Sequence, residues 1–204
     1  MKLSSLENYR VLPVVTAVDV ASTVKLARAL QGGGMKAIEI TLRTPAALDS
    51  MLAVQQEVPD ILVAAGTVNS PADLDKVLGI GVDLALSPGA TPELLRAAAQ
   101  SGIAFVPGVA TASEVMRGMA HGFDVFKLFP AVTVGGKGML KSLGGPFPDI
   151  RFCPTGGLNA DNFRDYLALP NVVCCGGSWM VQAELVAQGN WEQIELLARQ
   201  AMSE

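Results

Sequence analysis

The sequence is poor in charged residues, aromatic residues and histidine. Of its 204 residues, 17% are charged and 5% are aromatic, and the net charge is −4. No cluster of Lys and Arg interleaved with aromatic residues occurs, so nucleic acid is not an expected partner. The single histidine, His121, precedes Gly122 at a predicted helix end, where a cation or hydrogen-bond donor can interact with the last carbonyl groups of the helix. We therefore expect neither a histidine-based catalytic triad nor a histidine-ligated zinc ion.

Cysteine, long apolar runs and leader signals are also scarce. Cys153, Cys174 and Cys175 lie in apolar runs without metal-ligand spacing, which predicts buried free thiols and no metal site. No run of about 18 apolar residues occurs. The first residues lack the basic start, apolar centre and cleavage site of a signal peptide. The sequence therefore predicts a cytoplasmic protein without membrane spans.

What the chain does contain is a regular alternation of short apolar runs with longer amphipathic ones. The runs are almost continuously apolar, as expected of parallel strands that are covered on both faces. Eight strand candidates begin near Leu12, Ala37, Ile61, Asp83, Ala104, Asp124, Arg151 and Asn171. Helices are predicted over Val20–Leu30, Ala46–Glu57, Pro71–Leu78, Pro92–Gln100 and Ala112–His121. Ser70 and Thr91 precede prolines and are the expected N-caps of two of them.

This alternation predicts an α/β fold of the (β/α)8 TIM-barrel type, as one compact domain over residues 1–204. The alternative is an open doubly wound sheet, whose first turn should carry Gly-x-Gly-x-x-Gly. The first turn here reads Thr16-Ala-Val-Asp-Val, which favours the barrel. In a barrel, active-site residues gather where the strands end.

Lys127 is the one lysine that lies within an apolar strand-like run, Val-Phe-Lys-Leu-Phe-Pro-Ala. Burying an ammonium group costs several kcal/mol, and a buried lysine that becomes a neutral amine is a nucleophile for carbonyl substrates. Alternation along the strand places Val125 and Phe129 beside it. Lys127 is therefore either the nucleophile of an imine-forming enzyme or a lysine in a structural ion pair.

Glu39, Thr41 and Arg43 alternate with apolar residues on one predicted strand, so they should share the interior face of the barrel. Glu39 then either forms a structural ion pair with Arg43 or Lys127, or moves the protons that imine chemistry requires.

Glycine-rich runs follow the last two predicted strands, at Thr155-Gly156-Gly157 and at Gly176-Gly177-Ser178. Glycines let backbone N–H groups approach an anion closely. Barrel enzymes commonly hold a phosphate group in these two loops, so we expect a phosphorylated substrate.

These motifs, in this order, resemble the bacterial 2-keto-3-deoxy-6-phosphogluconate (KDPG) aldolases, which also act on 4-hydroxy-2-oxoglutarate (KHG). The resemblance covers nearly the whole chain and rests on the following segments: Glu39-Ile-Thr-Leu-Arg-Thr, Ala65-Gly-Thr, Ser87-Pro-Gly, Phe126-Lys-Leu-Phe-Pro-Ala, Arg151-Phe-Cys-Pro-Thr-Gly-Gly and Gly176-Gly-Ser-Trp. It implies a homotrimeric class I aldolase without a cofactor, which forms pyruvate and glyceraldehyde 3-phosphate in the Entner–Doudoroff pathway.

The resemblance also implies a role for each site residue. Lys127 would form the imine and Glu39 would act as general acid and base. Arg43 and Thr67 would hold the pyruvate carboxylate, and Pro88 and Phe129 would line the pocket. Thr155 would contact a substrate hydroxyl group, and the phosphate would be bound by Gly156, Gly157, Gly177 and Ser178.

Other functions stay open from the sequence alone. Thr155 favours the gluconate isomer over the galactonate isomer, whose enzymes tend to have valine there. A phosphosugar isomerase or epimerase would use Glu39 to move protons and Lys127 only to stabilise an enolate. A noncatalytic binding protein would have no use for a buried lysine and glutamate together.

Overall fold

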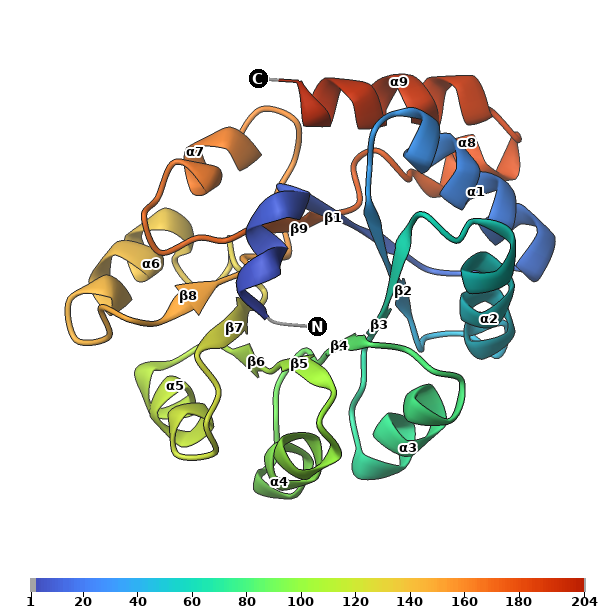
Figure 1. Ribbon diagram of the computed structural model, residues 1–204. Coiled ribbons are helices and arrows are strands. Elements are labelled where there is room, and N and C mark those ends of the chain that lie inside the picture. The colour runs from blue at the N-terminus through green and yellow to red at the C-terminus, as the bar shows by residue number, and fades with distance from the viewer. Residues whose placement is uncertain (1–2, 204) are drawn as a thin grey trace.

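The structure is a computed structural model that describes residues 3–203. The predicted domain therefore includes three residues, 1, 2 and 204, that lie outside the described part. Figure 1 shows short strands curling around a common axis, with helices on the outside. Within residues 3–203, no helix is both long enough and apolar enough to span a membrane.

The strands form two parallel sheets. One has six strands in the order β5-β4-β3-β2-β1-β9, and the other has three in the order β6-β7-β8. The strands are β1 (Val11–Val15), β2 (Ala37–Thr41), β3 (Leu62–Gly66), β4 (Leu84–Leu86), β5 (Ala104–Val106), β6 (Gly108–Val109), β7 (Val125–Leu128), β8 (Arg151–Phe152) and β9 (Cys175–Gly177). Isolated bridges, Phe152 to Val172 and Thr155 to Gly176, connect the chain around β8 with the chain around β9.

Helices follow most strands and cover the outside of the curled sheet. They are α1 (Val20–Gly32), α2 (Ala47–Glu57), α3 (Pro71–Gly79), α4 (Pro92–Ser101), α5 (Ala112–Met119), α6 (Gly136–Gly144), α7 (Phe163–Leu167), α8 (Ala183–Ala187) and α9 (Trp191–Met202). Ser70 and Thr91 accept hydrogen bonds from backbone N–H groups of α3 and α4, which confirms both predicted N-caps. His121 contacts the carbonyl oxygen of Arg117 at 2.9 Å, so its predicted place at a helix end is also confirmed.

Two strand predictions differ from the structure. The strand predicted from Ala104 is divided into β5 and β6, because Pro107 has no N–H group to give to a ladder. The strand predicted from Asn171 begins only at Cys175. The observed fold is thus a curled parallel α/β sheet, built from more and shorter ladders than the sequence predicts.

The core has two parts, one on each side of the sheet. The larger part fills the space between the strands and the outer helices. The smaller part lies inside the curl and consists mainly of Leu, Val, Ala and Cys side chains. Its Leu6 belongs to the 3-10 helix η1 (Leu3–Tyr9) and is only 1% exposed. Figure 1 shows η1 lying across the ring of strands, so this helix covers the end at which the strands begin.

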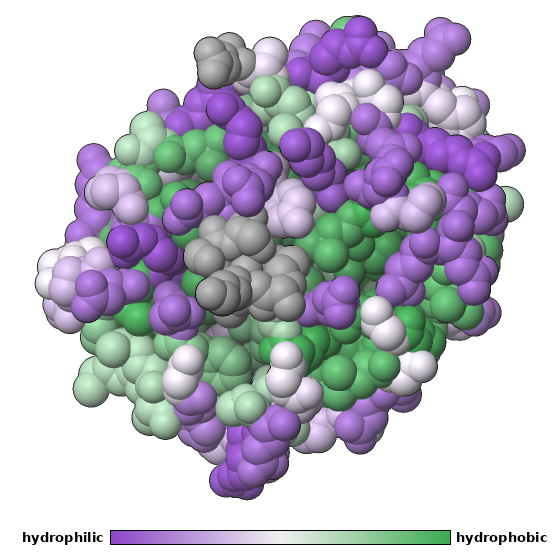
Figure 2. Space-filling view, viewed as in Figure 1, coloured by the Kyte–Doolittle hydropathy of each residue, from purple (hydrophilic) through white to green (hydrophobic). Residues whose placement is uncertain are grey.

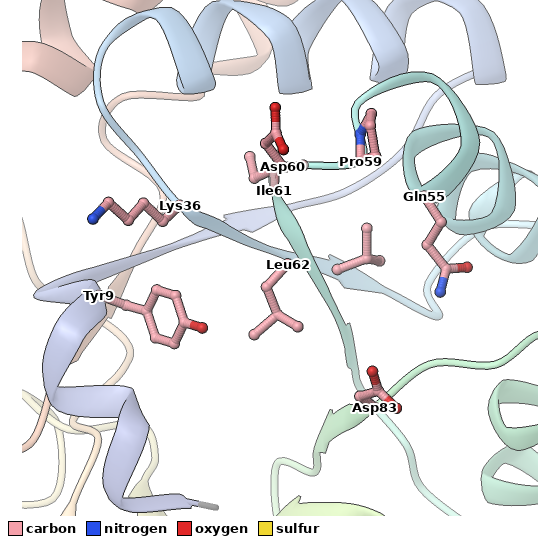
Figure 3. A pocket seen from close by; sticks show the side chains of 9 residues that line it. Tyr9, Lys36, Gln55, Pro59, Asp60, Ile61, Leu62 and Asp83 are labelled. Carbon is pink, nitrogen blue, oxygen red and sulfur yellow. The ribbon is translucent and has the colours of Figure 1, made fainter. Parts of the chain in front are cut away.

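The face that Figure 1 presents is the one where the strands begin. Figure 2 shows apolar areas between hydrophilic side chains on this face. A hollow of about 480 Å³ also opens there, lined by Tyr9, Lys36, Gln55, Asp60, Asp83 and neighbouring apolar residues (Figure 3). Because Lys36 precedes β2, this hollow lies at the amino ends of the strands. The opposite ends, where Thr41 and Gly66 close β2 and β3, carry the groups described next.

Candidate active site

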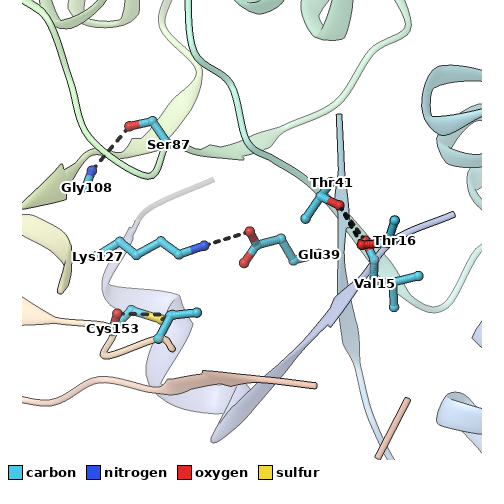
Figure 4. A network of polar contacts seen from close by, with 9 residues as sticks. Val15, Thr16, Glu39, Thr41, Ser87, Gly108, Lys127 and Cys153 are labelled. Atoms are coloured by element: carbon cyan, nitrogen blue, oxygen red, sulfur yellow. Dashed lines mark hydrogen bonds and ion pairs between the residues drawn. The ribbon is translucent and has the colours of Figure 1, made fainter. Parts of the chain in front are cut away.

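A buried ion pair joins two strands inside the curled sheet. Lys127 Nζ, from β7, donates a hydrogen bond of 2.7 Å to Glu39 Oε1, from β2 (Figure 4). The two side chains are 6% and 1% exposed. The two residues are 88 positions apart in the sequence, so the fold alone brings them together. Glu39 pairs with Lys127, the second of the two partners that the sequence left open.

The second carboxylate oxygen of Glu39 has no hydrogen-bond partner in the part of the chain that the structure describes. Within residues 3–203, Oε2 is buried and accepts no hydrogen bond. A buried acceptor without a donor is costly, and such an atom usually marks a place for water or a ligand. One oxygen of Glu39 therefore accepts the hydrogen bond from Lys127. The other is placed to accept a proton, or a hydrogen bond from a hydroxyl group.

Apolar groups surround the lysine as the alternation of the strand predicts. Val125 lies in the core cluster inside the curl. The ring of Phe129 is centred 5.7 Å from Lys127 Nζ. Phe129 is half-buried and precedes Pro130 through a cis peptide bond. The ammonium group thus faces one carboxylate and otherwise a largely apolar surrounding.

Arg43 differs from its prediction. Strand β2 ends at Thr41, and Arg43 lies in the following turn with an exposed side chain instead of an interior one. Thr41 is fully buried, and its hydroxyl donates to the carbonyl oxygen of Val15 at 2.9 Å. The interior face of β2 therefore ends with Thr41, because the chain turns away after that residue.

Arg43 and Ser178 line the same hollow, which has a volume of about 800 Å³. Thr16, Val18 and Trp179 are among its other lining residues. Ser178 is exposed and follows β9, whereas Gly177 is the buried last residue of that strand. The hollow lies where β1, β2 and β9 end. The structure therefore brings two predicted binding residues, Arg43 and Ser178, to the same hollow.

Thr67 and Pro88 follow β3 and β4. Thr67 has a left-handed φ of +62°, which is rare for a residue with a side chain and is characteristic of functional sites. Pro88 is half-buried beside Ser87, whose hydroxyl accepts a hydrogen bond of 3.2 Å from the N–H of Gly108. This bond ties the loop after β4 to β6.

The loop after β8 carries Thr155, Gly156 and Gly157. Thr155 is buried and lies opposite Gly176 across a parallel bridge. Gly156 and Gly157 have left-handed φ values of +98° and +83°, which glycine adopts readily. Among the hydrogen bonds between residues 3–203, none uses the N–H groups of Gly156, Gly157 or Ser178. These N–H groups are therefore available to an anion.

The cysteines are buried and free, as predicted. Cys153 lies inside the curl, with its sulfur 3.9 Å from the hydroxyl oxygen of Thr155. Burial raises the pKa of Cys175, and the hydrogen bond with Cys153 together with burial raises the pKa of Cys174, so both stay thiols. In the described part of the chain, no three His, Cys, Asp or Glu residues are grouped closely enough to hold a metal ion.

Sequence reasoning assigned no role to Gly66 and considered Gly176 only as part of a phosphate-binding run, but both glycines face inward beside site residues. A Cβ atom on Gly66 would overlap the carboxylate of Glu39, and one on Gly176 would overlap the hydroxyl of Thr155. Each glycine is paired across neighbouring strands with a residue that faces the inside of the curl, so each glycine faces inward as well. Only strand register, which the sequence does not contain, reveals these contacts.

The fold and the pair define an α/β enzyme class with a lysine–carboxylate site at the carboxyl ends of parallel strands. Residues 3–197 match the family model of KDPG and KHG aldolases. The chain is 48% identical to the 2-dehydro-3-deoxy-phosphogluconate aldolase of Pseudoalteromonas atlantica, over 95% of this chain and 90% of that protein. It is 45% identical to the KHG/KDPG aldolase of Escherichia coli, over 94% and 90%.

A solved structure agrees with these sequence matches. The KDPG aldolase of Legionella pneumophila, described with pyruvate captured as a covalent carbinolamine intermediate, superposes with a TM-score of 0.97. It is 42% identical and covers 100% of this chain and 99% of its own. The chain therefore belongs to the KDPG and KHG aldolase family.

Proposed function

We propose that this protein is a class I aldolase that cleaves KDPG to pyruvate and glyceraldehyde 3-phosphate. It also cleaves KHG to pyruvate and glyoxylate. The buried Lys127–Glu39 pair, with 2.7 Å between its charged atoms, carries this proposal. Further support comes from the family and from the Legionella relative, in which pyruvate is described as a carbinolamine.

The first half of the reaction forms the imine. The neutral amine of Lys127 attacks the C2 ketone and gives a carbinolamine. Glu39 protonates the departing hydroxyl group, so that water leaves and a protonated imine remains. Glu39 lies 2.7 Å from Lys127 Nζ, so it is placed to take the proton that the amine must lose before it attacks.

The second half breaks the C3–C4 bond. Glu39, through its free Oε2, takes the proton of the C4 hydroxyl group, and that carbon becomes the aldehyde of glyceraldehyde 3-phosphate. The electron pair of the broken bond moves into the protonated imine and gives an enamine. A proton then returns to C3, and water hydrolyses the imine to pyruvate and the free amine of Lys127.

The remaining site residues bind the substrate in this proposal. Arg43 and Thr67 hold the pyruvate carboxylate, and Pro88 and Phe129 line the pocket. Thr155 contacts a substrate hydroxyl. The phosphate is bound by Gly156, Gly157, Gly177 and Ser178. Supporting observations are the unbonded N–H groups of both loops and the shared hollow of Arg43 and Ser178.

Two alternatives make different demands on the same site. A galactonate-specific aldolase uses the same lysine, and Thr155 favours the gluconate isomer. An isomerase needs no covalent bond to Lys127, whereas an amine beside a carboxylate with a free oxygen suits covalent chemistry. The aldolase is therefore the function that the geometry supports best.

Fold and assembly complete the proposal. We infer that residues 1–204 form one domain and that its strands close into an eight-membered barrel, with β5 and β6 as one member interrupted by Pro107. The bridges from Phe152 to Val172 and from Thr155 to Gly176 support closure between β8 and β9. A homotrimer is proposed from the family resemblance. Exposed apolar side chains such as Met116 and Met119 on α5, 60% and 43% exposed, are suited to a subunit contact. A cytoplasmic location stays a prediction.

The test is borohydride reduction in the presence of pyruvate, followed by peptide mass spectrometry. We expect a reduced pyruvate adduct on Lys127, and no adduct in Lys127→Ala. Glu39→Gln should cleave KDPG about 10²–10⁴-fold more slowly, because it lacks the transferable proton. Lys76→Ala, which changes an exposed lysine on α3, is the control. Cleavage of KDPG without any trappable adduct would favour noncovalent chemistry and overturn the proposal.

A further inference from the structure

We propose that Gly66 and Gly176 are positioning residues, whose missing side chains leave the spaces in which Glu39 and Thr155 adopt their working orientations. This inference rests on the proposed function. It adds two residues to the site that do not touch the reacting atoms in the proposed mechanism.

Both glycines point into the curled sheet. Gly66 pairs with Thr41 in the ladder between β2 and β3, and paired residues of parallel strands face the same side. Gly176 pairs with Leu12, which lies in the interior core, and with Thr155. Barrel interiors are normally filled by branched side chains, so a glycine at such a position calls for a specific reason.

At Gly66 the space is occupied by the general acid and base. A Cβ atom built there would lie 2.7 Å from Glu39 Cγ and 2.9 Å from Cδ, and it would overlap Oε1. Oε1 is the atom that accepts the hydrogen bond from Lys127. Any side chain on Gly66 therefore displaces the carboxylate from the lysine.

At Gly176 the space is occupied by Thr155. A Cβ atom there would overlap the hydroxyl oxygen and lie 2.9 Å from Cγ2 and 3.0 Å from Cβ of Thr155. A methyl group at this position forces Thr155 to turn, and its hydroxyl then leaves the direction required to contact a substrate hydroxyl.

Alanine tests this idea cleanly, because neither glycine has a left-handed φ. The backbone can keep its conformation, and the atoms that must move belong to side chains. By contrast, a Cβ on Gly108 would meet the backbone of Pro88 and Gly89, where little can yield. Gly66→Ala and Gly176→Ala are thus expected to change geometry while preserving the fold.

The first experiment is a double-mutant cycle between Gly66→Ala and Glu39→Asp, with single-turnover cleavage of KDPG as the readout. Gly66→Ala should slow cleavage about 10²-fold, since a displacement of about 1 Å at a catalytic group has that effect. Asp is one methylene shorter, so it has no atom at the position of Oε1, which overlaps the new Cβ most closely, and the alanine displaces it less. The double variant should therefore cleave at least about tenfold faster than the product of the two single effects predicts.

Three results overturn the role of Gly66. They are cleavage by Gly66→Ala within about threefold of the wild type, single effects that simply multiply, and equal slowing in the control Gly79→Ala, where a Cβ meets nothing within 4 Å. If Gly66→Ala does not fold, the double variant must fold, and its failure to do so also refutes the inference. Absence of activity or of a borohydride adduct in the wild type would instead refute the proposed function.

The second experiment is the matching cycle between Gly176→Ala and Thr155→Ala, with kcat/KM for KDPG as the readout. Gly176→Ala should lower kcat/KM at least about fivefold in the wild type and have no further effect once Thr155 is alanine. Unchanged kcat/KM in Gly176→Ala, or the same loss in both backgrounds, would show that Gly176 does not act through Thr155.

Discussion

Replacing Lys127 by methionine should destabilise the protein strongly, beyond its effect on catalysis. Methionine fills a similar volume but has no charge, so the carboxylate of Glu39 stays 1% exposed and loses the hydrogen bond from Lys127. Removing one partner of a buried ion pair typically costs about 3–5 kcal/mol. For a chain of this size, that corresponds to a decrease in Tm of about 6–20 °C. Replacing both partners, in Lys127→Met with Glu39→Leu, should restore most of the lost stability, because no buried charge remains.

The assay is urea denaturation at neutral pH, followed by circular dichroism, with the free energy of unfolding obtained by linear extrapolation. The matched control is Arg28→Met, which removes the cation of the Arg28–Glu57 pair. That pair has a similar length, 2.8 Å, but its side chains are 56% and 51% exposed. Its loss should change the free energy by less than about 1 kcal/mol. If Lys127→Met and Arg28→Met have equal effects, the pair between Lys127 and Glu39 is not a buried ion pair and this reasoning is refuted.

Ser178→Asp should raise KM for KDPG more than KM for KHG, because it puts a negative charge where the phosphate is expected, and steady-state kinetics with both substrates measures the difference. Equal increases would place the phosphate elsewhere. Ser70→Ala should lower the free energy of unfolding by about 1 kcal/mol, since the N–H of Asp73 loses its cap, and a decrease in Tm of about 2–4 °C checks this. An unchanged Tm would mean that water replaces the cap. The hydrogen bond from Lys137 lowers the pKa of Asp165 below its ordinary value of 3.8. The carboxylate therefore contributes stability above about pH 3.8 and loses it as the pH falls through the lowered pKa, and Lys137→Met should raise that pKa in an NMR titration.

The elements with strong local signals are the ones that the sequence predicts well. Ser70 and Thr91 fix the starts of α3 and α4 because each hydroxyl bonds a nearby backbone N–H. The start of strand β2 at Ala37 is predicted correctly, because an apolar run begins there. The pair of Lys127 with Glu39 is predictable as a possibility, because each residue is a charged group in an apolar run.

What the sequence does not predict depends on contacts between distant segments. In the sequence, Arg43 continues the alternation of β2, but the chain turns after Thr41 and places Arg43 on the surface. The first residues of η1 carry no apolar strand pattern, yet Leu6 fills the end of the interior. The spaces at Gly66 and Gly176 can be recognised only when the strand register is known. Local pattern thus predicts the elements, whereas register and turns decide which groups meet.

The cover that η1 forms over the amino ends of the strands imposes an order on the proposed reaction. With Leu6 packed into that end, we expect molecules to enter and leave the interior from the opposite end. In the proposed mechanism, the three-carbon fragment is bound to Lys127 and lies deepest, and the phosphorylated fragment lies between it and the solvent. The aldehyde must therefore leave before pyruvate, and in the reverse direction pyruvate must enter first. The covalent enamine on Lys127 demands the same order of release, so the one-ended interior and the proposed chemistry both predict the product inhibition patterns of an ordered mechanism.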